Sequence, residues 1–226
     1  MVEAIRRGQL DRWLSPVESS MYAKLAASVS NDWLAGRIAL KQACVDESTG
    51  DRTNPVTLTV ANGLSGVPYI DGMRGVFCSI GHSAGWGVAA VSGQQIGVDI
   101  ERVKTRSRSL LRYITDDEEL AGVDVDGEDR DILVARIWTI KESSTKAWMT
   151  GLNVHPKFVR ISQIDTNRFT VRSTHPRMKL PSLRVAVYQS GDFVVALAYR
   201  EASDDGPTIH WVDASGVSAA KHAGNT

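Results

Sequence analysis

Cysteine is scarce in this sequence: Cys44 and Cys78 are the only two among 226 residues. Two cysteines so far apart exclude a zinc cluster, which needs thiolate or imidazole ligands at close spacing. A single disulfide stays open, although two buried free thiols in a reducing compartment are the simpler interpretation. We therefore expect a cytoplasmic protein that does not depend on a disulfide.

Long apolar runs and an excess of one charge are also missing. No stretch approaches the roughly 20 residues that span a bilayer, and residues 1–14 are too charged for a signal-peptide core. Lys plus Arg equals Asp plus Glu at 26 each, so nothing marks a nucleic-acid binder. With 42% hydrophobic residues, the chain has enough apolar material for a globular core. We expect neither a membrane nor a nucleic acid as a partner.

Apolar periodicity predicts two long helical stretches and a series of short strands. Helix is expected over residues 10–45 and 130–149, with cap candidates at Ser30, Asn31 and Asp32. Strands are expected at 56–60, 76–80, 86–91, 96–101, 158–161, 169–173, 184–189 and 193–199, with a further one at 208–212. The runs 86–91 and 96–101 read as a hairpin, and the end of the tail as disordered.

The segment GHSAGWG, residues 81–87, contains a G-x-S-x-G pattern. In a serine hydrolase this pattern is a strand–turn–helix elbow that exposes the nucleophile. Here β-favouring residues follow Ser83 instead of a helix, which argues against that chemistry. Backbone N–H groups in a glycine turn, with His82 and Ser83 as side-chain donors, form an anion cradle. A purely structural role for His82 is the alternative.

Acidic residues gather in the segment GVDIE, residues 97–101. The two-residue period of a strand places Asp99 and Glu101 on one face. Two carboxylates so close need a compensating cation, and oxygen-only ligands favour Mg²⁺. An exposed strand end with two solvated acids is the alternative interpretation.

A third acid lies in the predicted helix WTIKESSTK, residues 138–146. Glu142 and Lys146 are one turn apart on one face, a spacing that is also common for surface ion pairs. Trp138 and Lys141 beside them favour a binding role, in which the carboxylate holds a metal and the lysines neutralise phosphate oxygens.

GVDIE followed by WTIKESSTK resembles the signature pair of the 4′-phosphopantetheinyl transferase superfamily, and within it the two-lobed, surfactin-synthetase-activating type. The SIGHS segment (79–83) and the closing FVVALAY run (193–199) come in the same order. The specific motifs cover roughly residues 78–152. The resemblance implies transfer of 4′-phosphopantetheine from coenzyme A to a serine of an apo acyl or peptidyl carrier protein. Adenosine 3′,5′-bisphosphate would be released.

The resemblance also implies roles for individual residues. As Mg²⁺ ligands it implies Asp99, Glu101 and Glu142. Glu142 and Lys146 would be catalytic, with Glu142 or a metal-held water as the base. The residues expected to bind coenzyme A are His82 and Ser83 in the turn, Lys141 and Lys146 in the helix, and Arg37 and Lys41 in the first long helix.

Two departures from the family pattern concern the 3′-phosphate of coenzyme A. Many relatives have Ser before the His of the turn, where this chain has Gly81. Relatives often carry a basic residue in the segment that corresponds to SGVP (65–68), which has none here. Arg37, Lys41 or Arg74 would have to compensate.

The resemblance implies an α+β fold of two similar lobes, a pseudo-dimer in which each lobe packs a long helix on a small, mostly antiparallel sheet. The lobes are expected at 1–102 and 103–200, followed by a partly disordered extension at 201–226, with the active site in the cleft between them. We expect a monomer that binds coenzyme A and a carrier protein, with the basic stretch Arg106, Arg108 and Arg112 as a possible carrier contact. A non-catalytic binding module is the main alternative, and a hydrolase using Ser83 is the other.

Overall fold

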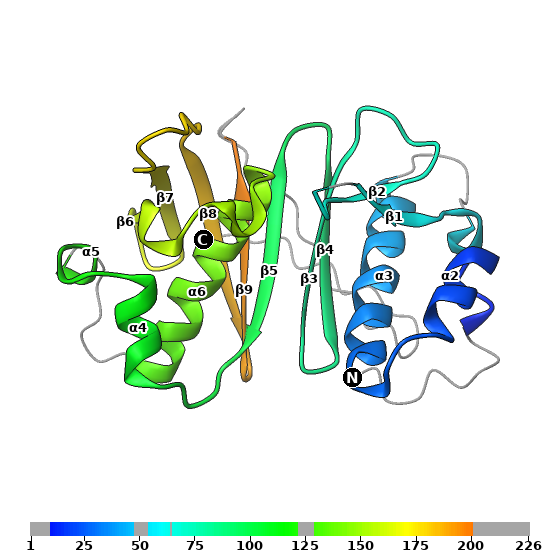
Figure 1. Cartoon of the computed structure of the whole chain (residues 1–226), viewed down its shortest axis with the longest axis horizontal. Coiled ribbons are helices and arrows are strands. Elements are labelled where there is room, and N and C mark those ends of the chain that lie inside the picture. The colour runs from blue at the N-terminus through cyan, green and yellow to red at the C-terminus, as the bar shows by residue number, and fades with distance from the viewer. Residues whose placement is uncertain (1–9, 48–53, 64, 122–128, 201–226) are drawn as a thin grey trace.

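The computed structural model describes residues 10–47, 54–63, 65–121 and 129–200. Within them the chain is an α+β protein with antiparallel sheets, as predicted (Figure 1). The helices are α2 (Pro16–Tyr22), α3 (Ala27–Glu47), α4 (Arg108–Ile114), α5 (Asp117–Ala121) and α6 (Arg130–Ala147), with 3-10 turns η1 (Pro55–Thr57), η2 (Gly151–Asn153) and η3 (Pro156–Phe158). The strands are β1 (Val60–Asn62), β2 (Pro68–Ile70), β3 (Phe77–Ser83), β4 (Trp86–Ser92), β5 (Ile96–Arg102), β6 (Val159–Gln163), β7 (Arg168–Ser173), β8 (Leu183–Ser190) and β9 (Phe193–Tyr199).

The first helical stretch is divided into α2 and α3 because a cap forms earlier than predicted. Ser15 and Glu18 form a reciprocal capping box that begins α2. The helix α3 then begins at Ala27, so the predicted caps at Ser30, Asn31 and Asp32 are wrong and these residues lie inside the helix. The second predicted helix is confirmed as α6, which Asp129 caps by accepting a hydrogen bond from the N–H of Asp131 at 2.7 Å.

The strand predicted over residues 56–60 is largely replaced by the 3-10 turn η1. Asn54 caps this turn by accepting a hydrogen bond from the N–H of Val56 at 3.2 Å, and Pro55 fixes the backbone of its first residue. Only Val60 of the predicted strand belongs to β1. The local side-chain cap therefore outweighs the β propensity of the valines and threonines.

Strand pairing differs from the predicted hairpin of 86–91 with 96–101. β4 pairs with β3 through a two-residue turn in which Ala84 and Gly85 have φ values of 52° and 83°, as a type I′ hairpin requires. β5 instead pairs with β9 at the edge of a five-stranded sheet of order β5-β9-β8-β7-β6. The predicted hairpin is wrong because each strand finds another partner, whereas the other strands predicted between 76 and 199 are confirmed.

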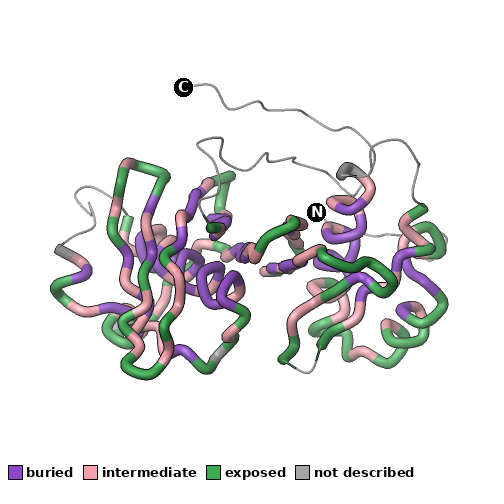
Figure 2. Tube along the Cα trace, turned by 90° about the horizontal axis from the view of Figure 1, so that it is seen from above, coloured by how far each residue is buried: buried purple, intermediate pink, exposed green. Residues whose placement is uncertain are grey.

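The two long helices cover different strands. α3 packs on β3 and β4, and α6 packs on β5 and β9, while β3 lies against β5 where the two groups meet (Figure 1). Viewed from above, buried positions concentrate on the inner strands and on α6, and the outer turns are exposed (Figure 2). The strand predicted at 208–212 and the extension 201–226 lie outside the described residues.

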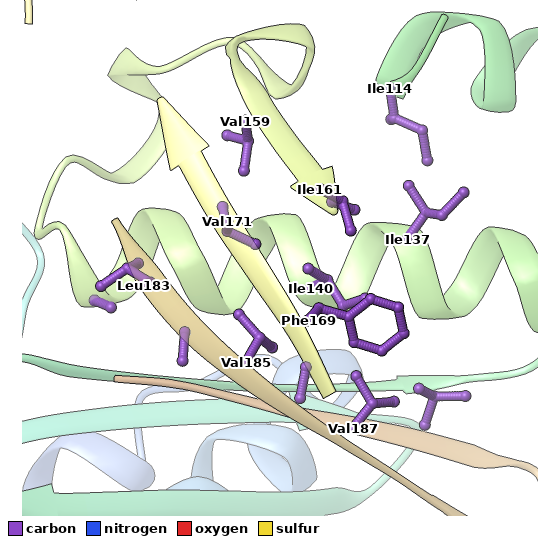
Figure 3. Packing of buried hydrophobic residues seen from close by; sticks show 14 of the residues in the cluster. Ile114, Ile137, Ile140, Val159, Ile161, Phe169, Val171, Leu183, Val185 and Val187 are labelled. Atoms are coloured by element: carbon purple, nitrogen blue, oxygen red, sulfur yellow. The ribbon is translucent and has the colours of Figure 1, made fainter. Parts of the chain in front are cut away.

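The largest apolar cluster lies between α6 and the five-stranded sheet (Figure 3). Ile137 and Ile140 of α6 face Phe169, Val185 and Val187 of the sheet, and all five are at most 2% exposed. Side chains of this size stabilise a fold by about 1.5–3 kcal/mol each when fully buried. This packing fixes α6, and with it every side chain on its opposite face.

Cys44 and Cys78 are both buried, and neither forms a disulfide. In the described part of the chain, no helix is long and apolar enough to cross a bilayer.

Candidate active site

The approach of α6 to β5 depends on a residue without a side chain, Gly97. A Cβ atom at this position would lie 1.9 Å from the carbonyl oxygen of Ser143 and 2.4 Å from the amide nitrogen of Ala147. Both distances are far below van der Waals contact, so only glycine lets the helix backbone rest on the strand. Asp99, two residues further along β5, is thereby brought against α6 and is only 7% exposed.

Lys146 of α6 joins three segments at this contact. Its Nζ donates to Oδ1 of Asp99 at 2.7 Å, to the carbonyl of Val98 at 3.1 Å and to the carbonyl of Ile80 at 3.0 Å. These three acceptors use all the donors of an ammonium group. The charge of Lys146 is therefore held at a fixed point between β3, β5 and α6.

The pKa values of Asp99 and Glu142 are both raised. Burial raises the pKa of Asp99, and the charge of Lys146 opposes that rise. Burial also raises the pKa of Glu142, and the neighbouring charge of Asp99 raises it further. Oδ2 of Asp99 is buried and accepts no hydrogen bond. Two carboxylates with surplus negative charge and a free oxygen fit a hard divalent cation.

Glu101, the third predicted ligand, is turned to other partners. Its Oε2 accepts from Nη2 of Arg106 at 2.7 Å and from Oγ of Ser83 at 3.4 Å. Over the described ranges, no three His, Cys, Asp or Glu side chains are grouped so that they could hold an ion as they stand. The predicted ligands thus lie in one region, with Glu101 engaged by an arginine.

Arg106 was expected on a carrier-binding surface with Arg108 and Arg112. Arg106 is directed at Glu101, with its side chain only 17% exposed, so it is not an open surface charge, and the carrier contact stays a prediction. Arg112 is exposed on α4. Nothing is described for the side chain of Arg108.

A carboxylate from α3, predicted as a helix cap, lies against the predicted anion cradle at residues 81–87. Oδ1 of Asp32 on α3 accepts the N–H of Gly85 at 2.6 Å, and Oδ2 lies 3.8 Å from Nδ1 of His82. One backbone donor of the turn is therefore already used. Ser83 accepts the N–H of Arg102 at 3.2 Å, which fixes its hydroxyl beside the acids.

Gly81, the first departure from the family pattern, has a packing explanation. A Cβ atom at this position would lie 2.9 Å from Cα of Asp99 and 3.0 Å from the amide nitrogen of Ile100. Glycine therefore lets β3 approach the backbone of β5 at Asp99. A serine at this position would push the two strands apart.

Lys141 points away from the acids. Its Nζ is buried and donates to Oε2 of Glu119 and to the carbonyl of Ile114, each at 2.6 Å, and to the carbonyl of Pro156 at 3.0 Å. Burial lowers the pKa of Lys141, and Glu119 opposes this shift. An ammonium group with three protein acceptors has no donor left for a phosphate, so the geometry supports a structural role instead of the predicted one.

The cations predicted on the first long helix are engaged in a similar way. Lys41 is fully buried and donates to Glu18 and to the carbonyl of Trp13. Arg37 stacks on the Trp33 ring, with its guanidinium carbon 3.6 Å from the ring centroid. Burial lowers the pKa of Arg37 to about 10, and the charge of Glu18 opposes this shift. Lys41 is thus unable to compensate for the uncharged SGVP segment, whereas Arg74 lies in an exposed turn.

Comparison with known proteins agrees with the motif pattern. Residues 95–198 match the family model described as the 4′-phosphopantetheinyl transferase superfamily. A 4′-phosphopantetheinyl transferase of Bacillus subtilis is 29% identical over 90 residues, which cover 39% of this chain and 40% of that protein. The matched region therefore spans well under half of the curated relative. Residues 95–198 contain β5 and α6, which carry Asp99, Glu101 and Glu142.

Proposed function

We propose, from the premise that residues 95–198 form a domain of the 4′-phosphopantetheinyl transferase superfamily, that this protein is a phosphopantetheinyl transferase. The reaction moves the 4′-phosphopantetheine group of coenzyme A onto a serine of an apo acyl or peptidyl carrier protein. Adenosine 3′,5′-bisphosphate is released. The observation that carries the proposal is the ion pair of Lys146 with Asp99, residues 47 positions apart, beside the carboxylate of Glu142.

We also propose Mg²⁺ as the cofactor. Asp99 and Glu142 would hold the ion, with Glu101 as a third ligand after it leaves Arg106. When bound, the ion neutralises the diphosphate and polarises the phosphorus that is attacked. The donor set supports this assignment, because it consists of oxygen atoms with unbalanced negative charge.

The side chains of this protein have separate tasks in the transfer. The serine Oγ of the carrier forms a bond to the β-phosphorus of coenzyme A, and the bond from that phosphorus to the bridging oxygen breaks. Glu142 is suited to accept the serine proton, because burial and Asp99 raise its proton affinity. Lys146 would stabilise the negative charge on the departing phosphate once Asp99 turns to the metal, because the donor that now binds Oδ1 of Asp99 is then released.

We propose in addition that the chain consists of two equivalent halves with the active site in a cleft between them. Support comes from a hydrogen-bond pattern that occurs twice. In the first half, buried Lys41 of α3 pairs with Glu18 of α2, 23 positions away. In the second half, buried Lys141 of α6 pairs with Glu119 of α5, 22 positions away. Glu18 also accepts the N–H of Val60, and Glu119 accepts the N–H of Ile161. Both hydrogen bonds join residues 42 positions apart.

The same pattern extends to the lysines. Lys41 donates to the carbonyl of Trp13, 28 positions earlier, and Lys141 donates to the carbonyl of Ile114, 27 positions earlier. Three equivalent hydrogen bonds at nearly equal spacing in each half are difficult to explain without internal repetition. The boundaries 1–102 and 103–200 stay a prediction, and β5 of the first range pairs with β9 of the second.

A single chain supplies both sides of the acidic group, which supports action as a monomer. The balanced charge of 26 basic and 26 acidic residues favours a protein partner over a nucleic acid. Two free thiols suit the reducing cytoplasm, which we propose as the place of action.

A non-catalytic module that binds coenzyme A or a carrier is the second candidate. The arrangement of Lys146, Asp99 and Glu142 argues against it, because binding alone does not require a buried carboxylate with raised proton affinity. A hydrolase with Ser83 as nucleophile is less suited to the site. The Ser83 hydroxyl donates to Glu101 and accepts the N–H of Arg102, whereas a hydrolase needs a histidine base at this hydroxyl.

The proposal is tested by intact-mass spectrometry of several apo carrier proteins incubated with coenzyme A and Mg²⁺. We expect a gain of one phosphopantetheine group, lost on chelation of the metal and in Glu142→Gln. Glu118→Gln is the matched control, since the side chain of Glu118 is 90% exposed, and it should retain the activity. If every carrier stays unmodified while the protein binds coenzyme A, the binding module is the better description.

A further inference from the structure

Arg106 is fixed at the start of α6 with its side chain directed at the acidic group. Its N–H donates to Oδ1 of Asp131 at 3.4 Å, and its carbonyl accepts from Nη1 of Arg130 at 3.1 Å. Nη2 lies 2.7 Å from Oε2 of Glu101, and the two side chains are only 17% and 19% exposed. The arginine is therefore a constituent of the site and not a surface charge.

The charges around the acidic group are unequal. Asp99, Glu101 and Glu142 bring three negative charges, while Lys146 and Arg106 bring two positive ones. Lys146 is fully engaged by its three acceptors. Arg106 is not, because its Nε is buried and donates to no acceptor.

We propose that Arg106 is an exchangeable partner of Glu101 that regulates metal binding and then binds substrate. Without a divalent cation, Arg106 holds Glu101 away from the other two carboxylates. When Glu101 turns to a cation, the guanidinium is released and donates to the diphosphate of the substrate. The substrate half of this inference rests on the proposed transferase function, whereas the metal half rests only on the proposed metal site.

Two physical arguments support the exchange. A carboxylate that is paired with a guanidinium must lose that partner before it can coordinate an ion, so the ion pair competes directly with the metal. A planar guanidinium can give two parallel hydrogen bonds to a phosphate group. The released Arg106 would then also have an acceptor available for Nε, which has none beside Glu101.

The metal half is tested with Mn²⁺ alone, by measuring free Mn²⁺ with electron paramagnetic resonance during titration of the protein. Arg106→Gln removes the competitor, so Mn²⁺ should bind about three- to tenfold more tightly than to the wild type. Arg102→Gln is the matched control. Arg102 also carries a positive charge at the end of β5, but it pairs with Asp192 at 3.5 Å and its side chain is 54% exposed.

A general electrostatic effect is separated from competition by a double-mutant cycle with Glu101→Gln. If Arg106 acts through Glu101, Arg106→Gln should change Mn²⁺ affinity less than twofold in the Glu101→Gln background. Equal tightening in both backgrounds, or in the Arg102→Gln control, overturns the proposal. Should Arg106→Gln fail to fold, Arg106→Met serves instead, because it also removes the charge that competes for Glu101 and keeps an apolar side chain of similar length.

The substrate half is tested by calorimetric titration of coenzyme A in the presence of Mg²⁺. Arg106→Gln should weaken coenzyme A binding about tenfold while it strengthens Mn²⁺ binding. A merely structural role would weaken both, and that result overturns the inference. Because the Mn²⁺ titration uses neither coenzyme A nor a carrier, it decides the metal half even if no carrier is modified.

Discussion

Gly97→Ala tests whether the contact between β5 and α6 creates the active site. The new Cβ would lie 1.9 Å from the carbonyl oxygen of Ser143, whereas carbon and oxygen need roughly 3.2 Å, so α6 must move by about 1 Å. Lys146 and Glu142 move with it, and the 2.7 Å ion pair of Lys146 with Asp99 is lost.

We expect kcat/KM for carrier modification to fall by about 100-fold, because a displacement of about 1 Å can cost that much. Overpacking of this kind should also lower the free energy of unfolding by about 1–3 kcal/mol. The first quantity is measured by the rate of holo-carrier formation and the second by urea denaturation.

Gly93→Ala is the matched control, since a Cβ atom at Gly93 meets no atom within 4 Å. It should change the unfolding free energy by less than about 0.5 kcal/mol and leave the rate unaltered. A Gly97→Ala protein with the rate and stability of the wild type would refute the reasoning, because α6 would then tolerate a shift that the geometry forbids.

Three further predictions concern residues outside the carboxylate group. Lys141→Met leaves the carboxylate of its partner buried and unpaired, so urea denaturation should show a loss of about 3–5 kcal/mol; an unchanged stability combined with weaker coenzyme A binding would instead favour the phosphate role. Asp32→Asn keeps the acceptor for the N–H of Gly85 but removes a charge 3.8 Å from His82. The family resemblance implies that His82 meets the 3′-phosphate of coenzyme A. The KM for coenzyme A should therefore fall about threefold while the KM for 3′-dephospho-coenzyme A stays constant, and equal changes for both substrates would contradict this. Asp116 has a lowered pKa because Arg160 donates a hydrogen bond to it. Its stabilising contribution is thus complete above its ordinary pKa and is lost as the pH falls, so the stability difference between wild type and Asp116→Asn should shrink below about pH 4; a difference that does not depend on pH in urea denaturation would contradict the assignment.

Local patterns predicted the elements that carry the site but not the partners of each strand. The apolar spacing of α6 and the alternation in β5 are properties of short segments, and both elements were predicted correctly. That β5 pairs with β9 depends on a strand almost a hundred positions away. No short-range signal in β5 distinguishes that partner from β4, which follows the same β-favouring pattern.

Lys141 and Lys146 show what the linear motif leaves out. Five positions on a helix correspond to a rotation of about 500°, so the two side chains point about 140° apart. Lys146 shares the face of Glu142, one turn away, and reaches Asp99. Helical geometry alone could have separated their roles, although no local signal marks Glu119, 22 positions away, as the buried partner of Lys141.

Asp32 illustrates a limit of a different kind. An aspartate ahead of an apolar helical pattern favours a cap, but α3 begins at Ala27 and Asp32 lies inside it. Its contact with the turn at His82 and Gly85 spans 53 positions. Only the packing of α3 on β3 and β4 places this carboxylate where a cluster of anion donors was predicted.

The ion pair of Lys41 with Glu18 joins α3 to α2, and the ion pair of Lys141 with Glu119 joins α6 to α5. Each ion pair therefore lies within one half of the chain and involves no residue of the other half. The turn between β4 and β5, at Gly93 and Gln94, is exposed and contributes no residue to either ion pair. Cleavage of the chain there would leave two fragments, each with its own lysine–glutamate ion pair. The strands β3 and β5, which contact each other, would then belong to different fragments. The peptide link at that turn then acts mainly as a tether, raising the effective concentration at which one fragment meets the other.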